Sequence, residues 1–334
     1  MENMKFEVKK LEEYPNISVV IPTYNDAKTL DKIIPSILNQ KYDGDIDITV
    51  VNDNSTDNSL DIIKKYKVKV ISHKKNMGLA NTVNDGVKNA KYDFVCVLHA
   101  DCFLADDEWF KKLIPYLVLN SDVACVTSAF ILPREIYNQF GFWEKAMHAW
   151  EVEKKVGEEI GVLDYSDGSN DIWKKEIFLR FGGYDAETYR VACEDVDLCK
   201  RMEKEGYKVL STPVIAYHLH SSHATGISTI LFKKNAQISE GQGVIFRKYK
   251  FRASSINNQL FKTTALVFLF VPITIIRIIG LIYIVSIIFG YTYIAFKKMR
   301  NLKVLVLLPP IKLLDFMIDV VCFWKGFLTK KQRL

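Results

Sequence analysis

Three carboxylates stand close together in one short segment, at Glu194, Asp195 and Asp197. Because a glycine-marked turn at 182–183 precedes them and Gly206 follows, we expect them where a loop becomes a helix. Negative charge is favoured there by the first-turn amides and the helix dipole, so the simplest interpretation is a capped, solvent-exposed helix start. The chemical interpretation is a general base held at the mouth of a pocket. Elements elsewhere in the chain must decide between the two.

The elements that position these carboxylates follow a regular order in the first half of the chain. Short apolar runs of strand length alternate with segments of helical periodicity, which predicts an α/β fold with a Rossmann-like, doubly wound, mostly parallel sheet. The expected strands cover residues 17–22, 47–51, 68–72, 94–98 and 123–127, with short strands at 207–210 and 214–217. Helices are expected over 30–38, 60–63, 81–90, 109–119 and 137–160, with a helix start at 173–178.

Polar clusters come directly after the predicted strands. Because the carboxyl ends of parallel strands form the ligand crevice, these clusters are candidate binding residues. Asp53 is placed to accept hydrogen bonds from a base or ribose, and Asp101 to bind a hard divalent cation through oxygen. Singly, each cluster is also explained by turn or helix-cap chemistry. The clusters comprise Pro22, Thr23, Tyr24 and Asn25, then Asp53, then Asn76 and Gly78, and finally His99, Ala100 and Asp101.

The C-terminal part of the chain has a different composition. Residues 278–296 form a 19-residue run without charge, close to the roughly 20 apolar residues that a membrane span needs. Pro272 interrupts the apolar run before it, and Pro309-Pro310 breaks the segment 304–324, which either spans or lies in the interface. We predict a lead-in at 1–15, a catalytic domain at 16–252, membrane-embedded or interfacial helices at 260–327 and a basic tail at 328–334.

Charge and cysteine content narrow the partners and the compartment. The net charge is a modest +6, and the Lys and Arg clusters flank the apolar stretches, a placement that suits anionic lipid headgroups better than nucleic acid. The six cysteines lack any C-x-x-C spacing, which argues against a zinc knuckle and favours a reducing location. The start of the sequence shows no secretory signal. We predict a protein of the cell membrane with its catalytic domain on the cytoplasmic side.

The order of the polar clusters resembles that of the family 2 glycosyltransferases of the GT-A fold. The resemblance covers roughly residues 16–225 and depends on six motifs in the right order, each weak alone. The motifs are Val19-Val20-Ile21-Pro22-Thr23-Tyr24-Asn25, Asn52-Asp53-Asn54-Ser55-Thr56-Asp57, Asn76-x-Gly78, His99-Ala100-Asp101, Gly182-Gly183-Tyr184-Asp185 and Glu194-Asp195-x-Asp197-Leu198. Two positions depart from the family pattern. His99 stands where the D-x-D metal motif has its first Asp, and Asn52 stands where Asp is common.

The resemblance implies a role for each matching residue. Asp53 would contact the nucleotide base, Asp101 would bind a Mg or Mn ion, and Asp195 would be the catalytic base. Glu194 and Asp197 would hold or polarise Asp195 and the acceptor loop. A histidine near the end of the domain would complete the metal site, and its candidates are His218, His220 and His223. On a strand, the first two of these share a side. The remaining strand-end residues would contact the nucleotide sugar.

The activity implied by the resemblance is that of an inverting hexosyltransferase. A nucleoside-diphosphate sugar binds across the strand ends, and Asp195 takes the proton from an acceptor hydroxyl of a lipid-linked glycan or surface polysaccharide precursor. By analogy, the turn 168–171 and Trp173 line the acceptor side.

Two alternatives stay open. One is a polyprenyl-phosphate sugar synthase, whose acceptor is already ionised. The other is a non-catalytic membrane protein that binds a sugar nucleotide. The expected partners are the donor, a glycan or polyprenyl-lipid acceptor and membrane lipids, with no nucleic acid. The donor sugar, the acceptor, the linkage, the membrane topology and the oligomeric state are left open by the sequence.

Overall fold

The computed structural model describes residue 6 and residues 9–332, apart from 153, 155, 158, 221–225 and 251–253. The chain divides into two compact units, each with its own hydrophobic core. Unit 1 comprises Met1–Ile131 and Lys155–His223, and unit 2 comprises Leu132–Lys154 and Ala224–Leu334.

Unit 1 is built on one mixed β-sheet. Its strands are β1 (Ile17–Thr23), β2 (Ile46–Asn52), β3 (Lys69–Ser72), β4 (Phe94–Leu98), β5 (Cys102–Leu104), β6 (Val123–Ile131), β7 (Gly161–Leu163), β8 (Asn170–Lys174) and β9 (Lys208–His218). They lie in the order β3-β2-β1-β4-β8-β6-β9-β5, with β7 against β9. The pairs β1–β2, β1–β4, β2–β3 and β6–β9 are parallel, whereas β8 runs antiparallel to both neighbours. The predicted α/β fold is confirmed.

Helices pack against this sheet. They are α1 (Ala27–Leu38), α2 (Ser59–Ile63), α3 (Leu79–Asn89), α4 (Trp109–Leu119), α7 (Lys175–Arg180) and α8 (Glu194–Glu203). Helix α3 contacts β1 and β2, and buries Ala80, Val83 and Val87, which recur at helical spacing. Gly86 on the same helix permits the close approach, because a Cβ there would lie 2.2 Å from Val20 Cγ1.

Three elements differ from the sequence-based prediction. Trp173 lies in β8 and not at a helix start, because its indole is fully buried in the sheet's core. The segment 137–160 was predicted to be helical, but its described residues are helical only within α5 (Arg134–Gln139) and α6 (Phe142–His148), both of which belong to unit 2. A single strand, β9, replaces the two predicted short ones, since a register shift against β6 accommodates Pro213, which lacks an N–H to donate.

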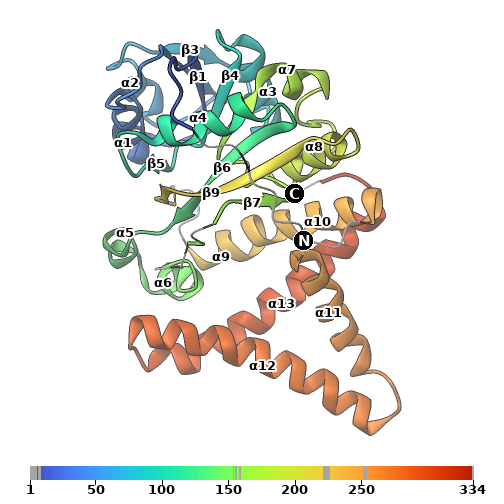
Figure 1. Ribbon diagram of the computed structural model, residues 1–334. Coiled ribbons are helices and arrows are strands. Elements are labelled where there is room, and N and C mark those ends of the chain that lie inside the picture. The colour runs from blue at the N-terminus through green and yellow to red at the C-terminus, as the bar shows by residue number, and fades with distance from the viewer. Residues whose placement is uncertain are drawn as a thin grey trace. The chain divides into compact units, whose positions relative to one another are not determined.

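Unit 2 is mainly helical. Besides α5 and α6 it contains α9 (Ile227–Thr229), the π-helical η2 (Ile230–Asn235), α10 (Ala236–Tyr249), α11 (Ser254–Phe268), α12 (Thr274–Met299) and α13 (Lys303–Thr329) (Figure 1). Helices α10 and α13 cross with their backbones in contact. A Cβ on Gly243 would lie 1.9 Å from Phe323 O, and one on Gly326 would lie 1.9 Å from Glu240 O. The crossing therefore requires glycine on both helices.

Helix α13 continues through Pro309-Pro310, so the predicted break at these residues is wrong. Each proline removes one backbone hydrogen bond of the helix. Packing compensates, because Val304 and Leu308, which precede the prolines, are fully buried in a cluster that also includes Ala295 of α12. The helix is thus held by its tertiary contacts.

Candidate functional site

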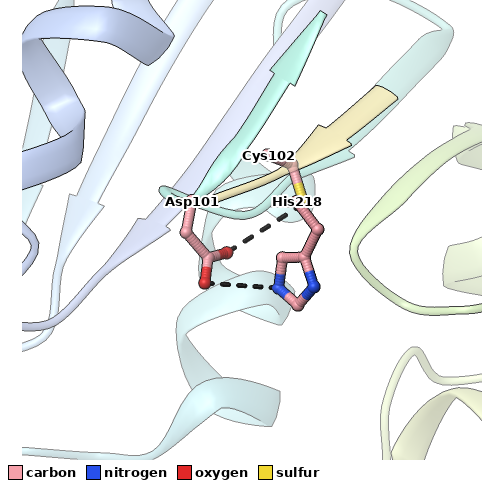
Figure 2. A group of neighbouring side chains, drawn as sticks. All are labelled: Asp101, Cys102 and His218. Atoms are coloured by element: carbon pink, nitrogen blue, oxygen red, sulfur yellow. Dashed lines mark hydrogen bonds and ion pairs between the residues drawn. The ribbon is translucent and has the colours of Figure 1, made fainter. Parts of the chain in front are cut away.

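Asp101 and His218 face each other where β5 and β9 pair. Cys102 lies opposite His218 in this antiparallel register, which brings the residue before Cys102 close to the imidazole. His218 Nε2 lies 3.3 Å from Asp101 Oδ2 (Figure 2). The backbone fixes the pair further, because Leu219 N–H donates to Asp101 O at 2.8 Å. The structure therefore brings together the carboxylate and one of the histidines that the sequence predicts as metal ligands.

The donor atoms here fit a divalent cation. One ligand atom from each of Asp101, Cys102 and His218 lies within 4.8 Å of the others. The Cys102 Sγ is the weakest of the three, since burial raises the pKa of its thiol well above the ordinary value. A carboxylate and a neutral imidazole suit Mg or Mn, with Mn the better match for nitrogen. His218 Nδ1 is buried without a hydrogen-bond partner, so the ring's tautomer is not fixed from that side.

Two further histidines lie near this pair. The ring centroids of His218 and His220 are 4.0 Å apart, and His220 has a left-handed backbone with φ of 49°. His99 belongs to the turn before β5, and burial lowers the pKa of its imidazole. His99 Nε2 is also buried without a partner, so a neutral ring nitrogen is available there. His223, the third predicted histidine, lies outside the described residues.

The three predicted catalytic carboxylates lie in the first turn of α8, as expected from the sequence. Glu194 is 4% exposed, and burial raises its pKa to about 7. Burial also raises the pKa of Asp195 well above its ordinary value, and the neighbouring charge of Glu194 adds to the effect. A carboxylate held in such a setting is a stronger base than one in water.

Asp197 has a structural partner. Its carboxylate is fully buried and accepts a hydrogen bond from Arg201 Nε at 2.9 Å, one turn along α8. The same guanidinium donates to Gly183 O at 2.7 Å and to Phe181 O. Asp197 therefore ties the start of α8 to the glycine turn that precedes it, and its predicted action on Asp195 and the acceptor loop stays a prediction.

One short turn, which contains Gly168 and Ser169, lies between Asp195 and the segment that carries the predicted metal ligand Asp101. His99 N–H donates to Ser169 O at 2.9 Å, which connects the turn to the segment that carries Asp101. The residue before Ser169 is Gly168, where a Cβ would lie 3.2 Å from Asp195 Oδ2. The predicted turn 168–171 is thus a turn only at its start, because Asn170 and Asp171 lie in β8 and are fully buried.

Asp53 lies beneath the Asn76–Gly78 turn. Its Oδ1 accepts hydrogen bonds from Met77 N–H at 2.7 Å, and its Oδ2 accepts one from Gly78 N–H at 2.9 Å. His73 Nδ1 lies 2.8 Å from Asp53 Oδ1, and His73 Nε2 lies 3.1 Å from Asp85 Oδ2. Asp53 is only 3% exposed, and its hydrogen bonds order this turn. Its contact with a nucleotide base stays a prediction.

The other predicted donor-binding residues are brought to the same end of β1 and β4. Thr23 is buried at the end of β1, whereas Tyr24 is 39% exposed. Asn25 has a left-handed backbone, and its Oδ1 accepts hydrogen bonds from Thr56 N–H at 2.6 Å and from Asp57 N–H at 3.2 Å. Tyr24 therefore offers an accessible ring for stacking, while Asn25 holds the loop after β2. Pro22 pairs with Val51 in the sheet, and Ala100 is 3% exposed.

Two residues near the site, His73 and Arg190, were not predicted from the sequence, and a third, Asp171, was predicted only as part of the turn 168–171. Asp171 is fully buried in the central strand β8. His73 bridges two carboxylates, and Arg190 Nη2 lies 3.4 Å from Asn76 Oδ1 while its carbonyl accepts Leu79 N–H. The signal for Asp171 was a charged residue next to the apolar pair Ile172-Trp173. The contacts of His73 and of Arg190 link segments that are distant in sequence, so no local sequence pattern predicts them.

The cysteines are all free in the structure, and the reducing location stays a prediction. Four of them, Cys96, Cys102, Cys125 and Cys199, are buried in unit 1. Cys193 precedes Glu194 at the start of α8 and has a left-handed backbone with φ of 71°, which is uncommon for a residue with a Cβ.

Comparisons with known proteins concern the family and the fold of this domain. Residues 18–176 match the family model described as Glycosyl transferase family 2. A glycosyltransferase of Haemophilus influenzae, itself uncharacterized, is 27% identical over 172 residues, which are 50% of this chain and 46% of the relative. A poly-beta-1,6-N-acetyl-D-glucosamine synthase of Staphylococcus epidermidis is 32% identical over 106 residues, 30% of this chain and 26% of the relative. The chain spans less than half the length of these two curated relatives.

Solved structures share the fold at low sequence identity. A mannosyltransferase, PcManGT from Pyrobaculum calidifontis in complex with GDP-Man and Mn²⁺, has a TM-score of 0.61 and 16% identity, covering 98% of this chain and 91% of that one. GalNAc-T7 with UDP, GalNAc and Mn²⁺ has a TM-score of 0.54 and 16% identity, covering 76% and 52%. The chain therefore carries a family 2 glycosyltransferase domain with a GT-A fold.

Proposed function

We propose that the protein is an inverting hexosyltransferase that moves a sugar from a nucleoside-diphosphate sugar to a hydroxyl of a lipid-linked glycan or surface polysaccharide precursor. The observation that carries the proposal is the continuity of the site. The turn that contains Gly168 and Ser169 bonds to the Asp101 segment on one side and lies against the Asp195 carboxylate on the other. A leaving group near Asp101 and an acceptor near Asp195 would therefore be held by one rigid piece of backbone.

Asp101 and His218 are the residues that would hold a divalent cation. When bound, a Mg or Mn ion stabilises the negative charge of the nucleoside-diphosphate leaving group. The two structural neighbours contain Mn²⁺ with a nucleotide or nucleotide sugar, which supports this use of the site. His220, whose ring lies beside His218, is the candidate for a further ligand.

Asp195 is the proposed base. It takes the proton from the acceptor hydroxyl as that oxygen bonds to the anomeric carbon, and the bond from this carbon to the diphosphate breaks on the opposite face. The configuration at carbon inverts. Glu194 sits beside Asp195 with a raised pKa, so at neutral pH it is partly protonated, which lowers the repulsion that Asp195 meets when it is ionised.

Relatives support a glycan acceptor. They include the poly-beta-1,6-N-acetyl-D-glucosamine synthase of Staphylococcus epidermidis and a chondroitin synthase of Pasteurella multocida, 30% identical over 125 residues, 36% of this chain and 13% of the relative. Both names refer to polysaccharide products. An acceptor that presents a sugar hydroxyl, and not a lipid phosphate, is therefore preferred, and it also gives Asp195 a proton to remove.

We also propose that unit 2 is embedded in the membrane. Helix α12 is the one described helix long and apolar enough to cross a bilayer, with 26 residues and a mean hydropathy of 2.1 in its most apolar window. Large apolar side chains are exposed along α12 and on α13, and Phe270, between α11 and α12, is 82% exposed. Such surfaces need a lipid partner. The proposed orientation has unit 1 on the cytoplasmic side.

Six charged side chains of α10, α11 and α13 form ion pairs within unit 2. Lys312 Nζ lies 3.0 Å from Asp315 Oδ2, Lys325 Nζ lies 3.0 Å from Glu240 Oε1, and Lys262 pairs with Asp319. Glu240 is fully buried. Apolar groups outside and paired charges inside are the arrangement expected in lipid, where an unpaired charge is costly. This pairing supports the same surroundings for α13 as for α12.

The proposal is tested by assaying sugar transfer from UDP-, GDP- and dTDP-sugars by the full chain in detergent. Transfer should require a divalent cation, stop with EDTA and be lost in Asp101→Ala. Asp106→Asn is the matched control, because Asp106 pairs with Lys112 on the following helix and not with the site. Transfer in EDTA, or by Asp101→Ala at the wild-type rate, would contradict the metal assignment. Parallel assays with polyprenyl phosphate and a polyprenyl-diphosphate sugar separate the two acceptor classes.

A further inference from the structure

We infer that the buried carboxyl of Asp171 fixes the turn 166–169 against Asp195, and that its charge state sets the acid limit of the pH range in which Asp195 acts as a base. The inference rests on the proposed function, because it takes Asp195 as the base. Asp171 is a positioning residue in this scheme, since it acts on the reaction through Gly168 and Asp195.

The first support is the place of Asp171 in the sheet. It is the second residue of β8, between Val97 of β4 and Thr127 of β6, and none of its surface is exposed. A carboxyl buried in a central strand is costly unless it makes specific interactions. Its Oδ2 accepts a hydrogen bond from Gly168 N–H at 2.9 Å. The carboxyl therefore anchors the turn 166–169 through Gly168, which lies three residues before it.

The second support is the contact between that turn and Asp195. Gly168 has a φ of +71°, and a Cβ on it would lie 3.2 Å from Asp195 Oδ2. Asp195 thus rests directly on the glycine whose N–H Asp171 holds. The next residue, Ser169, accepts the hydrogen bond of His99 N–H through its carbonyl. A shift of this turn would move the base and the metal side of the site relative to each other.

The third support is electrostatic. Burial raises the pKa of Asp171 to about 7. The hydroxyls of Ser166 and Thr127 lower this pKa, but burial has the larger effect. Asp171 therefore changes charge in the neutral range. Its negative form is one of the charges that raise the pKa of Asp195, after burial and the charge of Glu194. Removing the charge at Asp171 should let Asp195 ionise at lower pH.

Several titratable groups surround the two carboxyls. Those that act on Asp195 are Glu194 on the same helix, Asp171 in β8 and Asp167 in the turn. Other groups whose own pKa is raised in part by Asp195 complete the surroundings. They are the buried Cys125 in β6, Tyr184 and Cys199, and the half-buried Cys193. Asp171 differs from the others because it combines full burial with the hydrogen bond to Gly168.

The test compares pH profiles of kcat/KM for two substitutions at this position. Asp171→Asn keeps an oxygen that can accept the Gly168 hydrogen bond but cannot become charged, so the acid limb of the profile should move to lower pH by roughly 0.5 to 1 unit. Asp171→Val also removes the acceptor, so its plateau at high pH should fall about tenfold or more below that of Asp171→Asn. Donor affinity should stay within about twofold of wild type in both.

Asp167→Asn is the matched control. Asp167 is a neighbouring carboxylate of the same turn, but it is exposed. Its removal should move the acid limb less, and the movement should disappear in about 1 M salt, because exposed charges are screened. The limb shift of Asp171→Asn should persist in the same salt. If Asp171→Asn does not fold, Asp171→Ser, which keeps a small acceptor in the strand, carries the same expectation for the acid limb.

Two outcomes overturn the inference. If the acid limb of the Asp171→Asn profile coincides with that of wild type, the charge of Asp171 does not affect the ionisation of Asp195. If kcat/KM at high pH is equal in Asp171→Asn and Asp171→Val, the hydrogen bond from Gly168 to residue 171 does not position Asp195. A separate Asp195→Asn variant distinguishes these failures from failure of the proposed base. If that variant keeps turnover, the base assignment is wrong whatever the Asp171 variants do; if it is inactive, the Asp171 profiles alone decide the inference.

Discussion

Replacing Asp53 by alanine separates a structural role of this carboxylate from a ligand contact. The side chain is 3% exposed and accepts hydrogen bonds from Met77 N–H, from Gly78 N–H and at Oδ1 from His73. At about 1 to 1.5 kcal/mol for each of the three lost bonds, Asp53→Ala should lower the free energy of unfolding by about 3 to 4.5 kcal/mol. The reason is that two backbone donors and an imidazole would lose their acceptor in a poorly hydrated place.

Two measurements report on this loss. Guanidinium unfolding of the full chain in detergent gives the free-energy change, and hydrogen exchange gives the local effect. The amides of Met77 and Gly78, which donate to Asp53, should lose most of their protection. Asp85→Asn is the matched control, because Asp85 contacts only the outer nitrogen of His73 and is 51% exposed. It should cost less than about 1 kcal/mol.

The reasoning fails if Asp53→Ala unfolds like wild type and keeps both amides protected while nucleotide binding is lost. Asp53 would then be a ligand contact alone. The structure predicts instead that stability and donor binding fall together, since the Asn76–Gly78 turn loses its anchor. A variant that loses stability and keeps full donor affinity would show that the turn does not contact the donor.

The remaining predictions concern the helix crossing and the pH dependence of stability. Gly243→Ala would place a Cβ 1.9 Å from Phe323 O, so α10 and α13 must separate, and unit 2 should lose about 1 to 3 kcal/mol or more. Gly290→Ala, in open space on α12, should lose nothing, and equal melting temperatures for the two variants in detergent would contradict the crossing. Burial raises the pKa of both Asp171 and Glu194 to about 7, so their stability contribution is full below about pH 4 and is lost as the pH rises through about 7. The melting temperature of the metal-free protein should fall between pH 5 and pH 8, by less in Asp171→Asn, and a rise would refute the assignment.

Much of the sheet follows from local pattern. Ile17–Thr23 and Phe94–Leu98 are short apolar runs that end in polar clusters, and both are parallel strands whose ends carry candidate site residues. Periodicity also predicts the helices that bury Leu30, Ile33 and Ile37 on one face. These features depend on neighbours in sequence, so they can be predicted from it.

Features that depend on tertiary contacts could not be predicted in the same way. Trp173 lies in a strand because antiparallel pairing with Val95 and Cys125 fixes it in the core. Local sequence rules predict a helix break at the proline pair in α13, but packing in unit 2 stabilises the helix through both prolines. Asp171 is the clearest case, because its importance comes from Gly168 and Asp195, whose closeness only the fold creates.

The candidate site was partly accessible from sequence. The order of the motifs suggested that Asp101 and Asp195 work in one site, but it could not choose among the histidines. The β5–β9 register brings His218 to Asp101, with Nε2 and Oδ2 3.3 Å apart. The roles of Asp101, Asp195 and His218 stay predictions until they are measured.

The most direct test of the central claim is transfer of a labelled sugar by Asp195→Asn, with donor binding measured on the same preparation. The asparagine keeps the shape of the side chain but cannot accept the acceptor's proton. We expect a kcat lower by about 10² to 10⁴-fold, with donor affinity in the presence of Mn²⁺ within about twofold of wild type. A kcat within threefold of wild type would contradict Asp195 as the base.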